Sequence, residues 1–278
     1  MSKNRSRVAA IAVISGISLL LAGCSPEAQR GFLPDASGVT NHTDRIIGLW
    51  TTSWIVLLAV GVASWGLMAW ALIVYRRRKG ETGMPAQLRY NLPIETLFTV
   101  VPLILVLGFF AFTARDMTAI EAKTENPDVH IEVIAKQWSW DFNYVDENTF
   151  DSGIQAQFTG TEENVFETLP TLYLPVNKSV QIDLSSRDVI HSFWVIDFLY
   201  KKDMFPGVTN KMYFTPMKEG AYVGKCAELC GEYHSMMLFN VKVVSQAEYD
   251  SQMASLAARG NVGQLSTEYD RNQNLPGG

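Results

Sequence analysis

The run VHIEVIAKQWSWDFNY, residues 129–144, decides the fold class of the C-terminal part of this chain. Apolar and polar side chains alternate along it, which is the pattern of a β-strand with one buried face. Further alternating runs follow, separated by turn residues: TLYLPVNKSVQIDLSS (171–186), HSFWVIDF (191–198), KMYFTP (211–216), GAYVGKC (220–226) and LFNVKVV (238–244). Short strands at this spacing predict a β-sandwich or β-barrel.

Three segments around these runs differ in character. Residues 147–169 are polar, rich in Gly and Thr and poorly periodic, so we expect an extended surface excursion there. A helix is predicted to begin at Ser245, because Glu248 three residues later completes a capping box, and to end near Arg259. Residues 260–278 carry no apolar stripe and are predicted to be loose.

Three nearly charge-free stretches precede the β region, at residues 8–22, 46–75 and 94–114. The first is about 15 residues long and follows basic residues, which is typical of an export signal rather than a membrane span. It ends in LAGC, residues 21–24, which resembles a bacterial lipoprotein box, where the signal is removed and Cys24 becomes a lipid-bearing first residue. An ordinary first membrane helix with an incidental cysteine is the alternative.

The second and third stretches are long enough to cross a bilayer as helices. Ile46–Tyr75 contains 30 residues without a charged side chain, and Pro102 is expected to bend Ile94–Ala114. The connector, residues 76–91, carries five basic residues against one acid, which places it in the cytoplasm by the positive-inside rule. The chain is therefore predicted to be membrane-anchored by a two-helix hairpin, with one exported domain.

Glu95 is out of place in the third stretch. It lies about one helical turn inside the cytoplasmic end, where a carboxylate is costly unless it faces water or a partner. Two interpretations stay open: a functional carboxylate, or a residue of the interfacial zone.

The exported part is acidic. From Asp116 onward the chain has 23 Asp and Glu against 12 Lys and Arg. Such an excess repels nucleic acid and anionic lipid, but it can steer a basic protein into contact. The alternative is that the charge merely keeps the domain soluble. Nucleic acid is therefore not an expected partner.

The loop CAELCGEYHSMM, residues 226–237, gathers two thiols, an imidazole and two thioethers. In an exported domain, two cysteines four residues apart favour a disulfide. Thiolate, imidazole and thioether together form a soft ligand set that suits copper, whereas zinc seldom takes a thioether. A disulfide, a zinc site and a copper site are the interpretations that this loop allows.

The four histidines narrow the choice of ligands. His42 belongs to the outer segment before the first span, and His130 begins an alternating strand, where we expect it on the surface. His191 stands before an apolar strand, 35 residues upstream of Cys226, and His234 lies within the loop. Two histidines, a methionine and one thiolate would make a blue-copper site, so the second thiolate implies a second metal ion. Two bridging sulfurs leave one histidine for each metal, with a methionine on one and a backbone carbonyl on the other.

The pattern Cys-x-Glu-x-Cys-Gly-x-x-His-x-x-Met at 226–237, with DVIHSF (188–193) upstream, resembles subunit II of haem-copper cytochrome c oxidase. The resemblance extends to LPIETLFTVVP (92–102), to QWSW (137–140) and to the pair of spans, hence to nearly the whole mature chain. It implies a cupredoxin-like Greek-key β-barrel or sandwich behind a transmembrane hairpin. The expected division is signal peptide 1–23, outer segment 24–45, hairpin 46–115, CuA domain 116–259 and flexible tail 260–278.

The resemblance also implies roles for single residues. The copper ligands of the dinuclear CuA centre would be bridging Cys226 and Cys230, with His191, His234, Met237 and the carbonyl of Glu228. The side chain of Glu228 resembles a magnesium ligand at the interface with subunit I, Trp138 resembles the residue that receives electrons, and Glu95 matches the mouth of a proton pathway. Asp188 is expected to orient its neighbours, whereas Met236 and Trp140 are expected in the core.

The implied function is to accept electrons from cytochrome c and pass them to haem in subunit I, where oxygen is reduced to water and protons are pumped. Oxygen reduction needs haem and a further copper in another chain, so this chain is expected to be a subunit of a bacterial plasma-membrane oxidase. The other partners are further oxidase subunits, membrane lipid and a cytochrome c that is soluble or bound in a cytochrome bc complex. Rival interpretations are a copper-free subunit of a quinol oxidase, a nitrous-oxide reductase, which would need a further domain, and a tethered binding module with a Cys226–Cys230 disulfide.

Overall fold

The computed structural model describes residues 25–84, 87–156 and 162–268. The predicted export signal, residues 1–23, and Cys24 lie outside the described residues. The chain divides into two compact units, one formed by residues up to Asp35 with Trp50–Arg78, and the other by Ala36–Leu49 with Lys79 onward.

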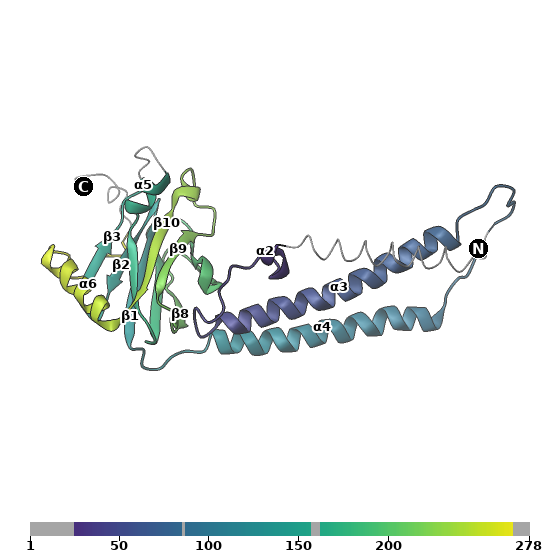
Figure 1. Ribbon diagram of the computed structural model, residues 1–278, viewed down its shortest axis with the longest axis horizontal. Coiled ribbons are helices and arrows are strands. Elements are labelled where there is room, and N and C mark those ends of the chain that lie inside the picture. Colours follow the sequence, from purple (N-terminus) through teal and green to yellow (C-terminus); the bar gives the residue numbers. More distant parts are fainter. Residues whose placement is uncertain (1–24, 85–86, 157–161, 269–278) are drawn as a thin grey trace, which may run out of the picture. The chain divides into compact units, whose positions relative to one another are not determined.

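Two long apolar helices, α3 (Thr43–Val74) and α4 (Leu92–Ile120), have the length and composition of membrane spans (Figure 1). The most apolar window of each helix is not buried within the chain. A helix that is apolar on all sides and uncovered by its own protein is suited to lipid or to neighbouring helices. Pro102 lies inside α4, as the sequence predicts. The expected two apolar helices ahead of the β domain are confirmed.

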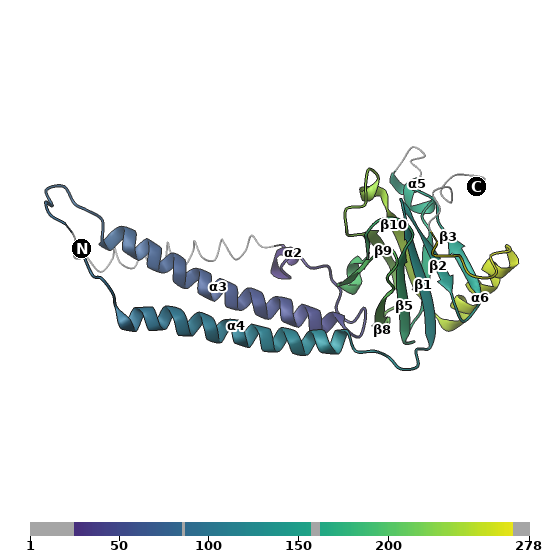
Figure 2. The ribbon, with the colours of Figure 1, turned by 180° about the vertical axis from the view of Figure 1, so that it is seen from behind.

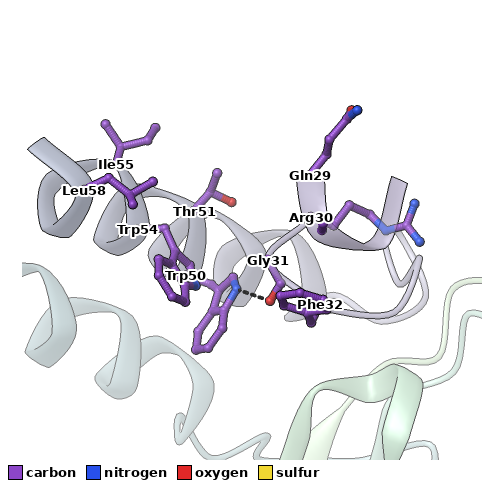
Figure 3. Close-up of a pocket in the computed structure, with 10 residues that line it drawn as sticks. Gln29, Arg30, Gly31, Phe32, Trp50, Thr51, Trp54, Ile55 and Leu58 are labelled. Atoms are coloured by element: carbon purple, nitrogen blue, oxygen red, sulfur yellow. Dashed lines mark hydrogen bonds between the residues drawn. The ribbon is translucent and has the colours of Figure 1, made fainter. Parts of the chain in front are cut away.

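The start of α3 carries two indoles beside a short helix, α2 (Pro26–Gln29). A cavity of about 300 Å³ lies there, between residues 28–32 and the side chains of Trp50, Trp54, Ile55 and Leu58 (Figure 3). Trp50 Nε1 donates a hydrogen bond of 3.2 Å to the carbonyl oxygen of Gly31. Tryptophan is enriched where a span meets the polar surface of the bilayer, so this end of α3 has the side chains of a membrane boundary.

The β domain consists of two five-stranded sheets. The first has the order β3 (Thr149–Ser152), β2 (Ser139–Tyr144), β1 (Val129–Lys136), β5 (Val180–Ser186), β8 (Asn210–Phe214). The second has the order β4 (Thr171–Pro175), β10 (Leu238–Val244), β9 (Gly220–Cys226), β6 (His191–Val195), β7 (Tyr200–Met204). Figure 2 shows β8, β5 and β1 side by side in the first sheet. The predicted sandwich is confirmed.

Two of the strand pairs are parallel. β1 pairs with β5 and β10 pairs with β4 in parallel, while the other pairs are antiparallel. The helix α6 (Gln246–Ala258) follows β10 and packs against β3 and β4 (Figure 1). Its predicted start is confirmed, because Ser245 Oγ accepts a 3.3 Å bond from Glu248 N.

An aromatic cluster fills the core between the sheets. Trp140, Phe193 and Phe239 are each no more than 1% exposed. The ring centroid of Phe239 lies 5.0 Å from that of Trp140 and 5.0 Å from that of Phe193. Since side chains two apart on a strand share a face, Phe193 and His191 both point inward from β6. The core therefore continues to the strand ends, where the candidate ligands lie.

Gly224 makes this close packing possible. It is the register partner of Phe239, and a Cβ at this position would lie 2.0 Å from the Phe239 ring. We expect Gly224→Ala to lower the free energy of unfolding by about 1–3 kcal/mol, because overpacking forces the ring to move. Denaturant unfolding of the full chain, followed by tryptophan fluorescence, measures the change.

Gly220→Ala is the matched control on the same strand. A Cβ there would meet only the end of the Tyr222 side chain, at 3.3 Å. Equal effects at the two glycines would contradict the role of the ring contact.

Candidate metal centre

The candidate ligands lie at the ends of three neighbouring strands of the second sheet. His191 is the first residue of β6, Cys226 is the last of β9, and Met237 directly precedes β10. Cys230 and His234 belong to the loop between β9 and β10, in which a short 3₁₀ helix, η2, spans His234–Met236. The order β10-β9-β6 therefore brings His191 to residues 226 and 237, although it lies 35 residues upstream of Cys226.

The donor atoms converge on the two sulfurs. Cys226 Sγ lies 3.9 Å from Cys230 Sγ, 3.8 Å from His191 Nδ1 and 3.2 Å from the carbonyl oxygen of Glu228. Cys230 Sγ lies 3.4 Å from His234 Nδ1 and 3.8 Å from Met237 Sδ. Each sulfur thus has one imidazole and one further donor beside it.

The two thiols are free in the structure. Their separation of 3.9 Å is about twice the length of a disulfide bond. Both are buried, together with the His191 side chain, and the ligand atoms of these three residues lie within 4.8 Å of one another. This is the geometry of a small metal site closed to solvent.

Electrostatics at the pair favour one thiolate at Cys226. The hydrogen bonds of Cys226 with Cys230 and with His191 lower the pKa of Cys226, although burial opposes this. The pKa of Cys230 is raised, because a second thiolate beside Cys226 is unfavourable and the site is buried. Thiolate is the form of cysteine that binds metal, and the lowered pKa of Cys226 favours that form.

Asp188 orients His191. Its Oδ1 atom lies 2.8 Å from His191 Nε2, which leaves Nδ1 facing Cys226. Burial opposes a charged imidazole, yet the hydrogen bonds to Asp188 and Cys226 raise the pKa of His191. A carboxylate on the far nitrogen fixes the tautomer and the ring orientation of a metal-binding histidine. The orienting role expected for Asp188 thus has a direct contact with His191 behind it.

The backbone of the loop is held by the β1–β2 turn. Gln137 Nε2 and Trp138 Nε1 both donate to the Cys230 carbonyl oxygen, at 2.7 Å and 3.2 Å. Gly231 follows with φ +123°, and a Cβ there would lie 3.1 Å from the Trp138 ring. The half-buried Trp138 also packs edge-on against Tyr233, at a centroid distance of 5.0 Å. Trp138 therefore contacts residues 226–237, here called the sulfur loop, through one carbonyl group.

The remaining predicted residues lie elsewhere or have other contacts. The Glu228 side chain is exposed, so only its carbonyl faces the sulfurs. Glu95 lies in the first turn of α4, where its Oε1 accepts a 2.8 Å bond from Asn91 N. Asn91 Oδ1 in turn accepts from Ile94 N, so Glu95 is part of a reciprocal helix cap. Trp140 is in the core, as expected.

The other two histidines are remote from the sulfurs. His42 Nε2 lies 2.9 Å from the carbonyl oxygen of Tyr213, and His130 Nε2 lies 3.3 Å from Asp183 Oδ2. His42 is buried, whereas His130 is partly exposed. Neither joins the sulfur loop.

Two supports of the loop were not predicted from the sequence. One is the Gln137 side chain, which stands inside the QWSW motif but carries no metal-ligand signal. The other is the excursion at 147–169, whose side chains Ala156, Val165 and Leu169 form a small cluster with Met236 and Leu238. These last two residues flank Met237, so part of the excursion packs against the loop. An apolar side chain every few residues in a polar stretch is too weak a pattern to reveal this.

The donor set fits a soft metal. Two sulfurs, two imidazole nitrogens and a thioether are the ligands that copper prefers, and every donor except the Glu228 carbonyl comes from a side chain in contact with a sulfur. A structural zinc site would be complete with four of these groups and would leave the thioether without a purpose.

Comparisons with known proteins agree with this description. Residues 129–244 match the family model described as cytochrome c oxidase subunit II, periplasmic domain. The "Probable cytochrome c oxidase subunit 2" of Streptomyces avermitilis is 42% identical over 267 residues, covering 84% of this chain and 84% of the relative. Cytochrome c oxidase subunit 2 of Corynebacterium glutamicum is 30% identical over 310 residues, covering 90% of this chain and 86% of the relative.

Among solved structures, the chain is similar to the periplasmic domain of subunit II of cytochrome oxidase from Bradyrhizobium japonicum. That match has 29% sequence identity and a TM-score of 0.45, and it covers 49% of this chain and 99% of the other.

Proposed function

This chain belongs to the cytochrome c oxidase subunit II family, and on that premise we propose that it accepts electrons from cytochrome c at a dinuclear copper centre, CuA, and passes them to haem in subunit I. It is a subunit of a haem-copper terminal oxidase and not a complete catalyst. The observation that carries the proposal is the convergence of two free sulfurs with two imidazoles, a thioether and a carbonyl.

Two bridged copper ions would share one electron, which keeps bond changes small on reduction. The role of this chain is to hold the donors still. Cys226 and His191 stand on strands of one sheet, and Cys230 is fixed by the two bonds to its carbonyl group. Burial of both sulfurs excludes water, and Asp188 keeps His191 Nδ1 directed inward. Ligands that barely move favour rapid electron transfer, and their outer contacts tune the potential.

Trp138 is the proposed point at which electrons arrive. Its ring is half-buried, and its N–H group contacts the Cys230 carbonyl. Tyr233, 39% exposed, lies against the same ring. A cytochrome docked on this face would therefore be one aromatic ring away from the sulfur loop. The acidic excess of the domain would attract a basic donor.

Copper analysis of the purified oxidase tests the proposal. We expect about two copper ions per chain beyond those of subunit I, with the near-infrared and electron-spin-resonance signature of one electron shared by two coppers. A Cys226–Cys230 disulfide without copper would support a tethered binding module instead. One zinc ion in place of copper would contradict the proposal equally.

The membrane arrangement follows from the family and the helices. The protein is membrane-anchored with an extracytoplasmic domain. We further propose that α3 and α4 both span the bacterial plasma membrane, that the basic connector is cytoplasmic, and that Cys24 carries lipid. The proposed division of the chain is a signal peptide (1–23), an outer segment (24–45), the hairpin (46–115), the CuA domain (116–259) and a tail (260–278). The mass of the mature N-terminus tests the lipid, since an unmodified Cys24 or an intact signal would refute it.

Two further roles are proposed for carboxylates. The exposed side chain of Glu228 would bind Mg²⁺ at the interface with subunit I, where a hard oxygen ligand suits that ion. Manganese substitution and its electron-spin-resonance signal, compared between the parent and Glu228→Gln oxidases, test this. An unchanged manganese signal in the variant would remove the proposal.

Glu95 is proposed to lie at the mouth of a proton pathway into subunit I. We expect Glu95→Gln to lower oxidase turnover roughly tenfold or more, because glutamine keeps the helix-capping acceptor for Asn91 N but cannot transfer a proton. Oxygen consumption at saturating cytochrome c measures the effect, with Glu81→Gln in the connector as control. Equal turnover in the two variants would leave Glu95 with a capping role only.

A further inference from the structure

Three charged side chains are buried in the first sheet, at the end of β1, in β2 and directly after β5. Lys136, Asp141 and Arg187 are 3%, 0% and 1% exposed. Asp141 Oδ1 lies 2.8 Å from Lys136 Nζ and accepts a 2.7 Å bond from Ser152 Oγ, while Asp141 Oδ2 accepts from Arg187 Nη1. Two cations thus share one carboxylate in the interior. Buried ions need all their partners, so the position of each group is tightly constrained.

Two members of this charged cluster are adjacent in sequence to residues that hold the sulfur loop. Lys136 precedes Gln137, whose side chain bonds the Cys230 carbonyl. Arg187 precedes Asp188, whose carboxylate contacts His191 and accepts a 2.7 Å bond from Gln137 N. Arg187 N also donates to the Ala135 carbonyl at 3.0 Å, which ties the end of β5 to β1. A shift of the guanidinium would therefore pass directly to Asp188.

A segment from the end of the chain completes the partners of Arg187. Residues 261–266, here called the C-terminal strap, lie within the part that the sequence suggested to be loose. Asn143 exchanges two 2.9 Å bonds with the backbone of Leu265. The carbonyl oxygen of Ser266 then accepts from Arg187 Nε at 2.8 Å and from Nη2 at 2.5 Å. The described part of the chain gives these two guanidinium donors no other acceptor.

We propose that the C-terminal strap positions the sulfur loop, because its hydrogen bonds fix the side chain of Arg187. Arg187 is a positioning residue that acts through Asp188 on His191, and through Asp141 and Lys136 on the turn that holds Cys230. Without the Ser266 carbonyl, two buried guanidinium donors lose their partner, and the side chain must move toward water to recover one. The inference rests on the proposed copper function only for its spectroscopic consequence, because the contacts themselves involve no metal.

Two shortened chains test the role of the strap. They differ in whether they keep the contacts of Leu265 and Ser266. A chain ending at Gln264 loses Leu265 and Ser266, whereas a chain ending at Glu268 keeps every contact that the described residues give the strap. Hydrogen exchange is measured on the metal-free full-length protein and on both variants. The reporters are the amides of Gln137 and Val189, which both donate to Asp188 at 2.7 Å. We expect roughly tenfold faster exchange at these two amides in the Gln264-terminated chain. In the Glu268-terminated chain, the exchange rates should equal those of the full-length protein.

The copper-loaded oxidase supplies the second readout. In the Gln264-terminated variant we expect an altered copper hyperfine pattern, because His191 has lost its fixed orientation. Arg187→Lys keeps a positive charge beside Asp141 but cannot make both bonds to Ser266, so it should reproduce the faster exchange. Arg259→Lys, at the exposed end of α6, is the matched control and should change neither readout.

The outcomes separate the strap from the copper centre. Equal exchange in the two shortened chains, or a uniform rise across β10 and α6 as well, would overturn the positioning role. If the parent chain binds no copper while the local exchange still rises, the proposed function fails and the strap stands. If copper binds normally but neither exchange nor hyperfine pattern changes, the strap is refuted and the proposed function stands.

Discussion

Replacing Cys226 by serine is expected to abolish the dinuclear copper centre and, with it, electron transfer from cytochrome c. A serine hydroxyl stays protonated and is a hard oxygen donor, so it cannot bridge two copper ions as the thiolate would. Loss of an outer contact alone typically costs a metal site 10–100-fold, so loss of a bridging ligand should lower turnover on the order of 100-fold or more. Copper should fall from about two ions per chain to one or fewer, and the near-infrared band should disappear.

Cys230→Ser should behave in the same way, because the two sulfurs occupy equivalent places 3.9 Å apart. Cys24→Ser is the matched control, being the same substitution at the third cysteine of the chain. It should leave the copper content unchanged. Met236 and Met237 offer a second contrast: Met237 lies 3.8 Å from Cys230 Sγ, whereas Met236 packs with the small cluster of the excursion. Retained copper and colour in either thiol variant would contradict the proposed centre.

Replacing Trp138 by phenylalanine is expected to slow electron transfer from cytochrome c while leaving the copper centre assembled. The change removes the N–H bond to the Cys230 carbonyl and shortens the ring that bridges loop and surface. We expect the second-order rate to fall on the order of 100-fold, since a small displacement of the reacting groups can have that effect. The copper spectrum should be nearly unchanged, because Gln137 still bonds the same carbonyl group. Stopped-flow mixing with reduced cytochrome c measures the rate.

Trp194→Phe is the matched control for Trp138. Trp194 is also half-buried, but it lies under Lys225, with the ammonium 4.8 Å from the ring centroid. Its replacement should leave the rate unchanged. Measuring each protein over a range of ionic strength separates docking from transfer. The parent rate should fall as salt rises because of the acidic surface, and Trp138→Phe should keep that slope at a lower rate. Equal rates for the two tryptophan variants would remove Trp138 from the electron path.

Much of the fold was predictable because it depends on patterns within short stretches of sequence. Alternation over 129–144 and in the later runs marked most of the strands: β1, β2, β4, β5, β6, β9 and β10 lie within those runs. β3 and β7 were missed: Thr149–Ser152 and Tyr200–Met204 are short edge strands with polar side chains, so no alternating apolar pattern marks them. The candidate ligands within residues 226–237 were also predictable, because one loop contains most of them.

The sequence by itself determined the two apolar helices, the β class of the domain and the types of donor group in its sulfur loop, because periodicity, length and residue type belong to short segments. Only the tertiary structure decided that β6 lies beside β9, which brings His191 to Cys226, and that Ser266 reaches Arg187. The physical reason is that strand order and buried ion partners depend on contacts between residues far apart in the chain. No local pattern records which distant group will satisfy a buried charge or complete a metal site.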